Sequence, residues 1–342
     1  MTWLTWRQLR LQAAAVYALV AAACAWLALT GPDLARKARA SDDVLGALTS
    51  TDRMLFNGGL AVLAVVPALI GVFWGAPLVA RELETGTYRL AWNQSVSRGR
   101  WLATKLGLSV VLTALAVGVL SAVVTWWAHP LDGVQGGQRG SLPARLTPIS
   151  FAMRGVVPVG YAVFALLLGT LIGLLLRRSV PAMALTLAVY VVLQVAVPLW
   201  VRPHLVPTTT TTSVISSDNL DSIGSSGSGP FRITTGTGDP RDWVLSNRTV
   251  DASGTVAELP TWFAGCLPPA PDDAAGGNVE VRPAPGTMDK CLTRLADEGY
   301  RQRLVLHPRS DFWPLQWTET GLYLGLAAVL AGLCAWRVRR LS

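Results

Sequence analysis

Long apolar segments separated by short charged stretches dominate the chain. Six segments have about the ~20 apolar residues that a helix needs to cross a ~30 Å hydrocarbon core. They cover approximately residues 12–30, 59–79, 106–128, 155–176, 180–201 and 318–336. Their interiors contain no Lys, Arg, Asp or Glu, and Glu319 lies at the edge of the last one. The pattern predicts an all-α polytopic membrane protein with six transmembrane helices.

The first apolar segment has a second interpretation, because Arg7 and Arg10 precede it as they would in a secretory signal peptide. A signal core usually has ~7–15 apolar residues. This segment runs for nearly twenty, and no small-x-small cleavage site follows it. The sequence therefore favours an uncleaved first span.

Basic residues are concentrated in alternate connections between the spans. The pieces 1–11, 80–105, 177–179 and 337–342 hold 12 of the 29 Lys and Arg residues and only two acidic residues. Lys and Arg accumulate on the cytoplasmic side of membrane helices. These pieces and both termini are therefore predicted to be cytoplasmic. Because the excess of +8 lies beside helix ends, it indicates attraction to the lipid bilayer and not nucleic-acid binding.

The longest polar region, 202–316, lies between the fifth and sixth spans and is expected outside the cytoplasm. Within it, 208–230 is rich in Thr, Gly and Ser and is typical of a low-complexity linker. A hairpin around Ser253-Gly254, a helix over 288–300 and a strand over 303–307 predict a small α+β extracytoplasmic domain. The predicted domains are 1–201 (helices one to five), 202–316, and 317–342 (sixth helix and cytoplasmic tail).

The four cysteines fall into two classes. Cys24 and Cys334 lie within spans and are expected to be buried as small apolar residues. Cys266 and Cys291 lie in the outer region, where the compartment is oxidising. A disulfide between these two is predicted, and two free thiols are the alternative.

Catalytic motifs are missing from the sequence. His129, His204 and His307 lie far apart, without partners at metal-ligand spacing. The chain also lacks a G-x-x-x-x-G-K-[ST] phosphate loop and a G-x-S-x-G nucleophile elbow. We therefore expect no catalytic residue, metal or cofactor. The lack of charged residues inside the spans argues against an ion-coupled pump. Any transport must take its energy from another chain.

Some residues within the spans have a predicted role in packing or in a pathway. Pro67 and Pro77 are expected to kink the second span and are candidates for lining a pathway. Gln194 is the only large polar side chain of the fifth span, so it is either a pathway contact or a helix–helix hydrogen bond. Gly169 and Gly173 form a G-x-x-x-G pattern that favours close helix contact within the chain.

The cytoplasmic piece 80–105 reads A-R-E-L-E-T-G-T-Y-R-L-A-W-N-Q-S-V-S-R-G-R-W-L-A-T-K. It resembles the first intracellular loop of ABC transporter permeases of the type-2 exporter superfamily, in which E-x-G-[ST]-x-[RK] precedes a Ser-x-x-[RK] turn and a Lys. The matching positions are Glu84, Gly86, Thr87, Arg89, Ser97, Arg100 and Lys105. The resemblance extends to 5–8 and 312–319 but does not cover 208–285.

This resemblance implies that the loop docks into a separate cytoplasmic ATPase subunit as a coupling helix. The expected docking residues are Arg81, Glu82, Glu84, Gly86, Thr87, Tyr88 and Arg89. The alternative is a charged loop that only fixes topology. Topology needs only Lys and Arg, so the two glutamates favour docking. The resemblance further implies two copies of the ATPase subunit, a second permease (a homodimer), and a bacterial plasma membrane.

These observations predict the permease subunit of an ATP-driven exporter. The uncharged spans favour a hydrophobic or amphiphilic substrate, and the kinked second span and the fifth span are expected to line its path. The alternative is a non-transporting membrane sensor or scaffold whose extracytoplasmic domain binds a ligand. An intramembrane enzyme is disfavoured by the missing catalytic groups.

Overall fold

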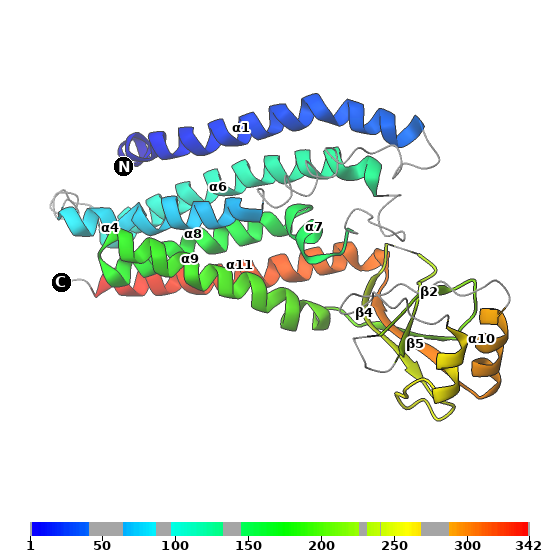
Figure 1. The fold of residues 1–342 in the computed structure, drawn as a ribbon. Coiled ribbons are helices and arrows are strands. Elements are labelled where there is room, and N and C mark those ends of the chain that lie inside the picture. The colour runs from blue at the N-terminus through cyan, green and yellow to red at the C-terminus, as the bar shows by residue number, and fades with distance from the viewer. Residues whose placement is uncertain are drawn as a thin grey trace, which may run out of the picture. The chain divides into compact units, whose positions relative to one another are not determined.

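The structure is a computed structural model of the 342-residue chain. It describes residues 2–40, 64–86, 97–132, 145–225, 231–239, 241–267 and 287–340. The chain divides into two compact units (Figure 1). The helical unit comprises 1–134, 147–206 and 312–342, and the mixed unit comprises 135–146 and 207–311. Each unit is described by itself below.

Within the described residues, six long helical runs build the helical unit. Its elements are α1 (Thr2–Ala40), η1 (Gly71–Gly75), α4 (Ala76–Thr85), α6 (Arg98–Ala128), η2 (His129–Leu131), α7 (Pro148–Met153), α8 (Val157–Leu176), α9 (Ser179–Ala196), η3 (Val197–Val201), η4 (Arg202–His204) and α11 (Phe312–Arg339). Helix α4 completes a second run that begins at Ala64. All six runs are long and apolar enough to cross a membrane, so the prediction of a multi-pass membrane protein is confirmed.

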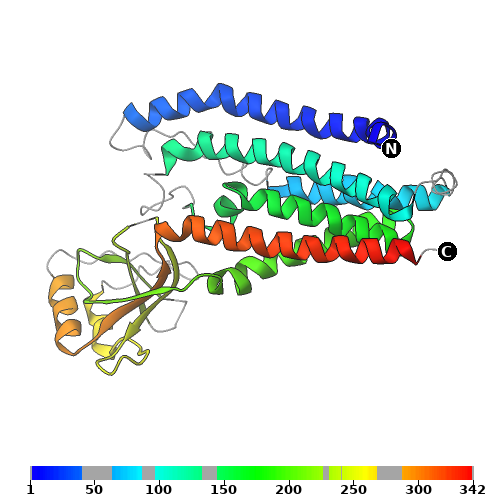
Figure 2. The same ribbon diagram turned by 180° about the vertical axis from the view of Figure 1, so that it is seen from behind.

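Helix α8 forms the core of the helical unit. Most of its apolar window is buried, whereas most of the windows in α1, α9 and α11 face outward. A helix that is apolar all round is suited to this central place. In Figures 1 and 2, α8 runs among α4, α6, α9 and α11. The outward faces of the other helices are available to lipid.

Glycines bring α8 into backbone contact with the second span. A Cβ added at Gly169 would lie 2.3 Å from the carbonyl oxygen of Gly71, and one added at Gly173 would lie 2.4 Å from that of Ala76. From the other side, a Cβ on Gly75 would lie 2.4 Å from the carbonyl oxygen of Leu166. The G-x-x-x-G pattern therefore packs within the chain, as predicted.

A π-helical turn, η1, interrupts the second span just before Pro77. Proline has no backbone N–H, so it cannot complete the regular helical ladder. The N–H of Ala76 instead donates to the carbonyl of Gly71, five residues earlier. The hydroxyl of Thr170 in α8 donates to the Gly75 carbonyl at 3.2 Å. The second span is thus distorted without breaking, and a neighbouring helix satisfies a displaced carbonyl.

Both chain termini lie at the same end of the helical unit in Figures 1 and 2. The end of α4 and the beginning of α6 lie at this end too, whereas α9 ends and α11 begins at the opposite end. An even number of spans requires this arrangement. The residues of the 80–105 piece that the structure describes therefore lie at the end that carries the termini.

The described residues of the mixed unit form two antiparallel sheets. Its elements are β1 (Thr209–Ser213), β2 (Leu220–Ser225), β3 (Phe231–Thr235), β4 (Trp243–Val250), η5 (Thr261–Cys266), α10 (Thr287–Asp297), β5 (Arg301–His307) and η6 (Arg309–Asp311). One sheet has the order β1-β5-β4, and β2 pairs with β3 in the other. The chain turns at Ser253-Gly254 as predicted, but a single bridge between Val250 and Val256 takes the place of the expected hairpin. Helix α10 and strand β5 overlap the predicted helix and closing strand. The stretch 208–230, expected to be a linker, instead contains strands β1 and β2. The threonines of β1 have a high strand propensity.

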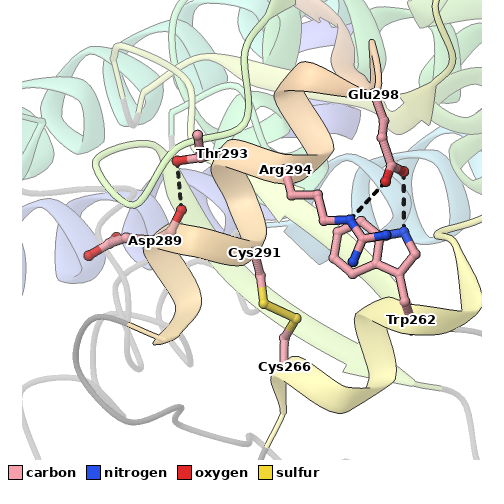
Figure 3. Close-up of a disulfide and its surroundings, with 7 residues drawn as sticks. All are labelled: Trp262, Cys266, Asp289, Cys291, Thr293, Arg294 and Glu298. Atoms are coloured by element: carbon pink, nitrogen blue, oxygen red, sulfur yellow. Dashed lines mark hydrogen bonds and ion pairs between the residues drawn. A yellow bond between two sulfur atoms is a disulfide. The ribbon is translucent and has the colours of Figure 1, made fainter.

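A disulfide joins Cys266 in η5 to Cys291 in α10, as the sequence predicts (Figure 3). It borders the core of the mixed unit, in which Phe263, Leu292 and Leu295 are fully or almost fully buried. On the outer side of α10, the guanidinium of Arg294 lies 4.1 Å from the centre of the Trp262 ring. Glu298 accepts hydrogen bonds from both of these side chains (Figure 3). These contacts fasten η5 to α10.

Replacing Cys266 and Cys291 with alanine is expected to lower the free energy of unfolding of the mixed unit by about 3 kcal/mol, because the disulfide closes a loop of about this length in the unfolded chain. The bridge spans 25 residues. Limited proteolysis of the full-length protein, with the mixed-unit fragments identified by mass spectrometry, measures the change. Reductant should sensitise the unaltered chain and leave the double variant unchanged. Equal protease resistance of the two proteins without reductant would contradict the prediction.

Candidate coupling site

The charged segment after the second span begins as the last turns of α4. Gly86 ends this helix in the left-handed conformation, with φ 73° and ψ 4°. Glycine takes this conformation at little cost, which explains its place at the helix end. Arg81 is exposed on the last turns. Thr87, Tyr88 and Arg89 lie outside the described residues, so the docking role expected of them remains a prediction.

Glu84 links the second span to the fifth. Its carboxylate Oε2 accepts a hydrogen bond from the backbone N–H of Ser179 at 3.1 Å and another from the Ser179 hydroxyl at 2.9 Å. Ser179 is the first residue of α9, and the preceding Arg178 makes no side-chain cap. A carboxylate at this place satisfies a free helix N–H and interacts favourably with the helix dipole. Glu84 therefore caps α9 from another helix.

Glu82 links the second span to the third. Its carboxylate forms an ion pair with the Lys105 ammonium group. The Lys105 side chain is buried and lies 5.0 Å from the centre of the Trp101 ring. Ser97 caps the beginning of α6, where its hydroxyl oxygen accepts from the backbone N–H of Arg100 at 3.3 Å. The ion pair thus holds the end of α4 against the first turns of α6.

The two glutamates of the charged segment have partners inside the chain. The sequence predicts both as docking residues, together with Arg81, but the structure joins Glu82 to α6 and Glu84 to α9. Of their partners, Lys105 matches the family pattern and Ser179 does not belong to it. Ser179 could have been found as a partner of a carboxylate because it begins an apolar helix that has no side-chain cap of its own. This segment is therefore arranged to connect three spans.

A buried polar cluster at the other end of the helical unit was not predicted. The Arg202 guanidinium donates to both oxygens of the Glu319 carboxylate, at 2.7 and 3.0 Å. Tyr161 donates its hydroxyl to Glu319 and accepts from Arg202 at 3.1 Å. Both charged side chains are completely buried. Their mutual pairing compensates for the loss of water, which explains why two charges are tolerated inside a membrane unit.

This cluster corrects the predicted limits of the last two spans. The sixth helix begins at Phe312 and not near residue 318, so Glu319 lies within it instead of at its edge. The fifth helical run continues past residue 201 through η4, which includes Arg202. Gln316, one turn before Glu319, accepts the backbone N–H groups of Val156 and Val157, each at 2.9 Å. The polar end of α11 therefore fixes both the beginning of α8 and the end of the fifth run.

A comparison with protein families identifies the helical part of the chain. A family model described as "ABC-2 membrane transporter related" matches residues 5–202, which is more than half of the protein. The chain belongs to this family. No curated protein and no solved structure matches the chain. ABC-2 permeases generally have an ABC ATPase as their partner, and the family indicates a non-catalytic transmembrane subunit.

The pathway candidates of this ABC-2 protein take part in packing. Pro67 and Pro77 are buried, on the turns before and after η1. The Gln194 side chain accepts a hydrogen bond from the Tyr323 hydroxyl at 3.0 Å and so joins α9 to α11. This contact is the helix–helix hydrogen bond left open by the sequence. The described residues do not bring these three side chains together with the coupling segment, so a pathway role remains a prediction.

Metal chemistry has no support in the described part of this ABC-2 protein. Across those residues, no group of three or more His, Cys, Asp or Glu side chains is arranged to hold a metal ion. The charged clusters described above for the helical unit consist of ion pairs and a helix cap between its helices. Such contacts hold the helices in position relative to one another.

Proposed function

We propose that this protein is the permease subunit of an ATP-driven exporter, and that a cytoplasmic ABC ATPase subunit acts on the 80–105 segment. The observation that supports this proposal is the attachment of α4 to two other spans through Glu82 and Glu84. A loop that served only to fix topology would not need either contact. A loop that receives a mechanical push needs rigid connections to the helices that must move.

In this proposal different residues of the charged segment have different roles. Arg81, together with Thr87, Tyr88 and Arg89, contacts the ATPase subunit. Glu82 and Glu84 then carry the displacement to neighbouring helices. Because Glu84 binds the first residue of α9, a shift of the α4 end moves the fifth span along with it. In this proposal the membrane protein transmits the displacement between helices, and the ATPase partner hydrolyses ATP.

The remaining features of the assembly follow from the same proposal. Two copies of this chain pair as a homodimer and bind two ATPase subunits, with both termini on the cytoplasmic side of a bacterial plasma membrane. The mixed unit then lies outside the cytoplasm, which agrees with its disulfide. The exposed apolar side chains of the fifth helical run, Val191, Val192 and Val195 in α9 and Leu199 in η3, suit a hydrophobic or amphiphilic substrate.

Co-expression with a candidate ABC ATPase subunit from the same genome tests the proposal as a whole. The two chains should co-purify, and vesicles that contain both should expel a lipophilic fluorescent dye only when ATP is present. Absence of both co-purification and ATP-dependent efflux would exclude the permease assignment. It would favour the sensor or scaffold alternative.

The Glu84→Ala variant tests the transmission step. Efflux is expected to fall by roughly tenfold because the charge-assisted link to Ser179 is lost, while the amount of co-purified ATPase subunit stays the same. The matched variant Arg81→Glu should instead reduce the amount of co-purified ATPase subunit, since Arg81 is exposed and is proposed to contact that subunit. If Glu84→Ala reduced co-purification as strongly as Arg81→Glu, Glu84 would be a direct docking residue. Unchanged efflux would show that the link is not used.

A further inference from the structure

Strand β1 presents an open edge in the mixed unit. It is the first strand in the order β1-β5-β4, and among the described strands it pairs only with β5. Four of its five residues, Thr209 to Thr212, are exposed, and Ser213 is half-buried. An edge strand carries a row of backbone N–H and C=O groups that can pair with another strand. The edge of β1 contains no charged residue and no proline.

The opposite edge of the same sheet is protected. Strand β4 has an irregularity in its register between Val244 and Ser246, and it carries the exposed charge of Arg248. The chain then turns back so that Val256 bridges to Val250 and covers the end of the strand. A bulge, a charge and a covering segment are the devices that keep sheet edges from pairing. All three are found at β4, and among the described residues none of them is found at the exposed threonines of β1.

We infer that β1 is a pairing surface for β1 of a second copy of this chain. Antiparallel pairing about a twofold axis through Thr211 places Thr209 opposite Ser213 and Thr210 opposite Thr212. Every opposed pair then consists of hydroxyl residues, and such pairs stabilise a sheet. The contact is isologous, as in most homodimers. It creates a continuous six-stranded sheet in the order β4-β5-β1-β1-β5-β4.

The composition of the edge favours a second copy over a foreign peptide. A strand of another protein is selected by charges or side-chain pockets beside the edge. The row Thr209–Ser213 offers neither, but it matches its own reverse in residue type and lacks the charges that would repel a copy. The inference rests on the proposed homodimer and adds that the mixed units take part in it. It assigns a function to a segment that looks like a linker.

Disulfide cross-linking in membranes tests the contact. The variant is Thr211→Cys in the full-length chain, with the free cysteines Cys24 and Cys334 replaced by alanine. Directly opposed residues of an antiparallel pair have Cβ atoms about 4.5–5.5 Å apart, close to the range that a disulfide requires. A mild oxidant should produce a covalent dimer. The matched control is Thr255→Cys, which is exposed in the same unit. We expect at least about tenfold less dimer from it.

A second variant tests the pairing without relying on one cysteine. Thr210→Lys with Thr212→Lys places like charges opposite each other in the proposed register, which destabilises a strand pair. Added to Thr211→Cys, it should reduce cross-linking by at least about fivefold. The control pair Ser222→Lys and Thr255→Lys adds the same charge at other exposed positions. It should leave cross-linking unchanged.

The outcomes separate this inference from the proposed function. No dimer from Thr211→Cys, equal dimer from Thr255→Cys, or cross-linking that survives the β1 lysines would each overturn the β1 contact. A Thr211→Cys product that joins the chain to a different protein would also overturn it, in favour of a foreign strand. Co-purification of the ATPase subunit is measured on the same preparations. If it is retained while cross-linking fails, the permease assignment stands and only the β1 contact is lost.

Discussion

The Glu319→Leu variant should lose about 3–5 kcal/mol of the free energy of unfolding of the helical unit, since it leaves the Arg202 charge buried without a partner. Arg202 and Glu319 are both fully buried, and the nearest alternative acceptor for the guanidinium is the Tyr161 hydroxyl. A neutral hydroxyl cannot compensate a charge taken out of water. Denaturant titration of the purified protein in detergent measures the change. The Arg202→Met variant should be destabilised to a similar extent.

The double variant Arg202→Met/Glu319→Leu is the decisive control. It removes both charges and leaves apolar side chains in a buried site, which is often neutral or even stabilising. Most of the lost stability should therefore return. Tyr161→Phe removes one hydroxyl and should cost only about 1 kcal/mol. If Glu319→Leu alone were as stable as the unaltered protein, Arg202 would have to reach water. That result would contradict the burial of the Arg202–Glu319 pair.

The Gly169→Ala variant should destabilise the helical unit by about 3 kcal/mol, the upper range for overpacking. The added methyl group would lie 2.3 Å from the Gly71 carbonyl oxygen, which belongs to backbone and cannot rotate away. The second span would have to move off α8, and the Thr170 hydrogen bond to the Gly75 carbonyl would break with it. Dye efflux should be lost together with stability.

Gly107→Ala is the matched control for this substitution. Gly107 lies within α6, and a Cβ built there meets no atom within 4 Å. Alanine is a better helix former than glycine by about 1 kcal/mol, so this variant should be neutral or slightly more stable. Thermal unfolding of the two variants in the same detergent compares them directly. A Gly169→Ala protein that unfolds at the temperature of Gly107→Ala would contradict the backbone contact.

The spans could be predicted from the sequence because their signal is long and local. About twenty consecutive apolar residues have few alternatives to a membrane helix. Arg202 and Glu319 show where local signals fail. Each looks like the polar boundary of its own span, and only their contact across 117 residues makes burial possible. For the same reason the sequence predicts the end of the fifth run too early in the chain and the beginning of the sixth helix too late.

The coupling segment was found through a short motif, but its contacts were not. The place of Gly86 has a local explanation, because glycine is common at helix ends and α4 ends there in a left-handed conformation. The partner of Glu84 could not, since Ser179 lies 95 residues away and any exposed cation was an equally reasonable choice. The prediction of a linker at Thr209 to Thr212 failed for a different reason. Low complexity suggested a linker, although each residue taken alone favours a strand.

The glycine contact between α8 and the second span has a consequence for movement. Interfaces made of side chains can slip, because rotamers exchange and reseat as helices slide over one another. Where two backbones are in direct contact there are no rotamers to exchange. Gly169 and Gly173 of α8 and Gly75 of the second span form such a backbone contact. We therefore expect α8 and η1 to move as one rigid body during transport. The conformational changes of the cycle would then take place in the helices that pack around this rigid body.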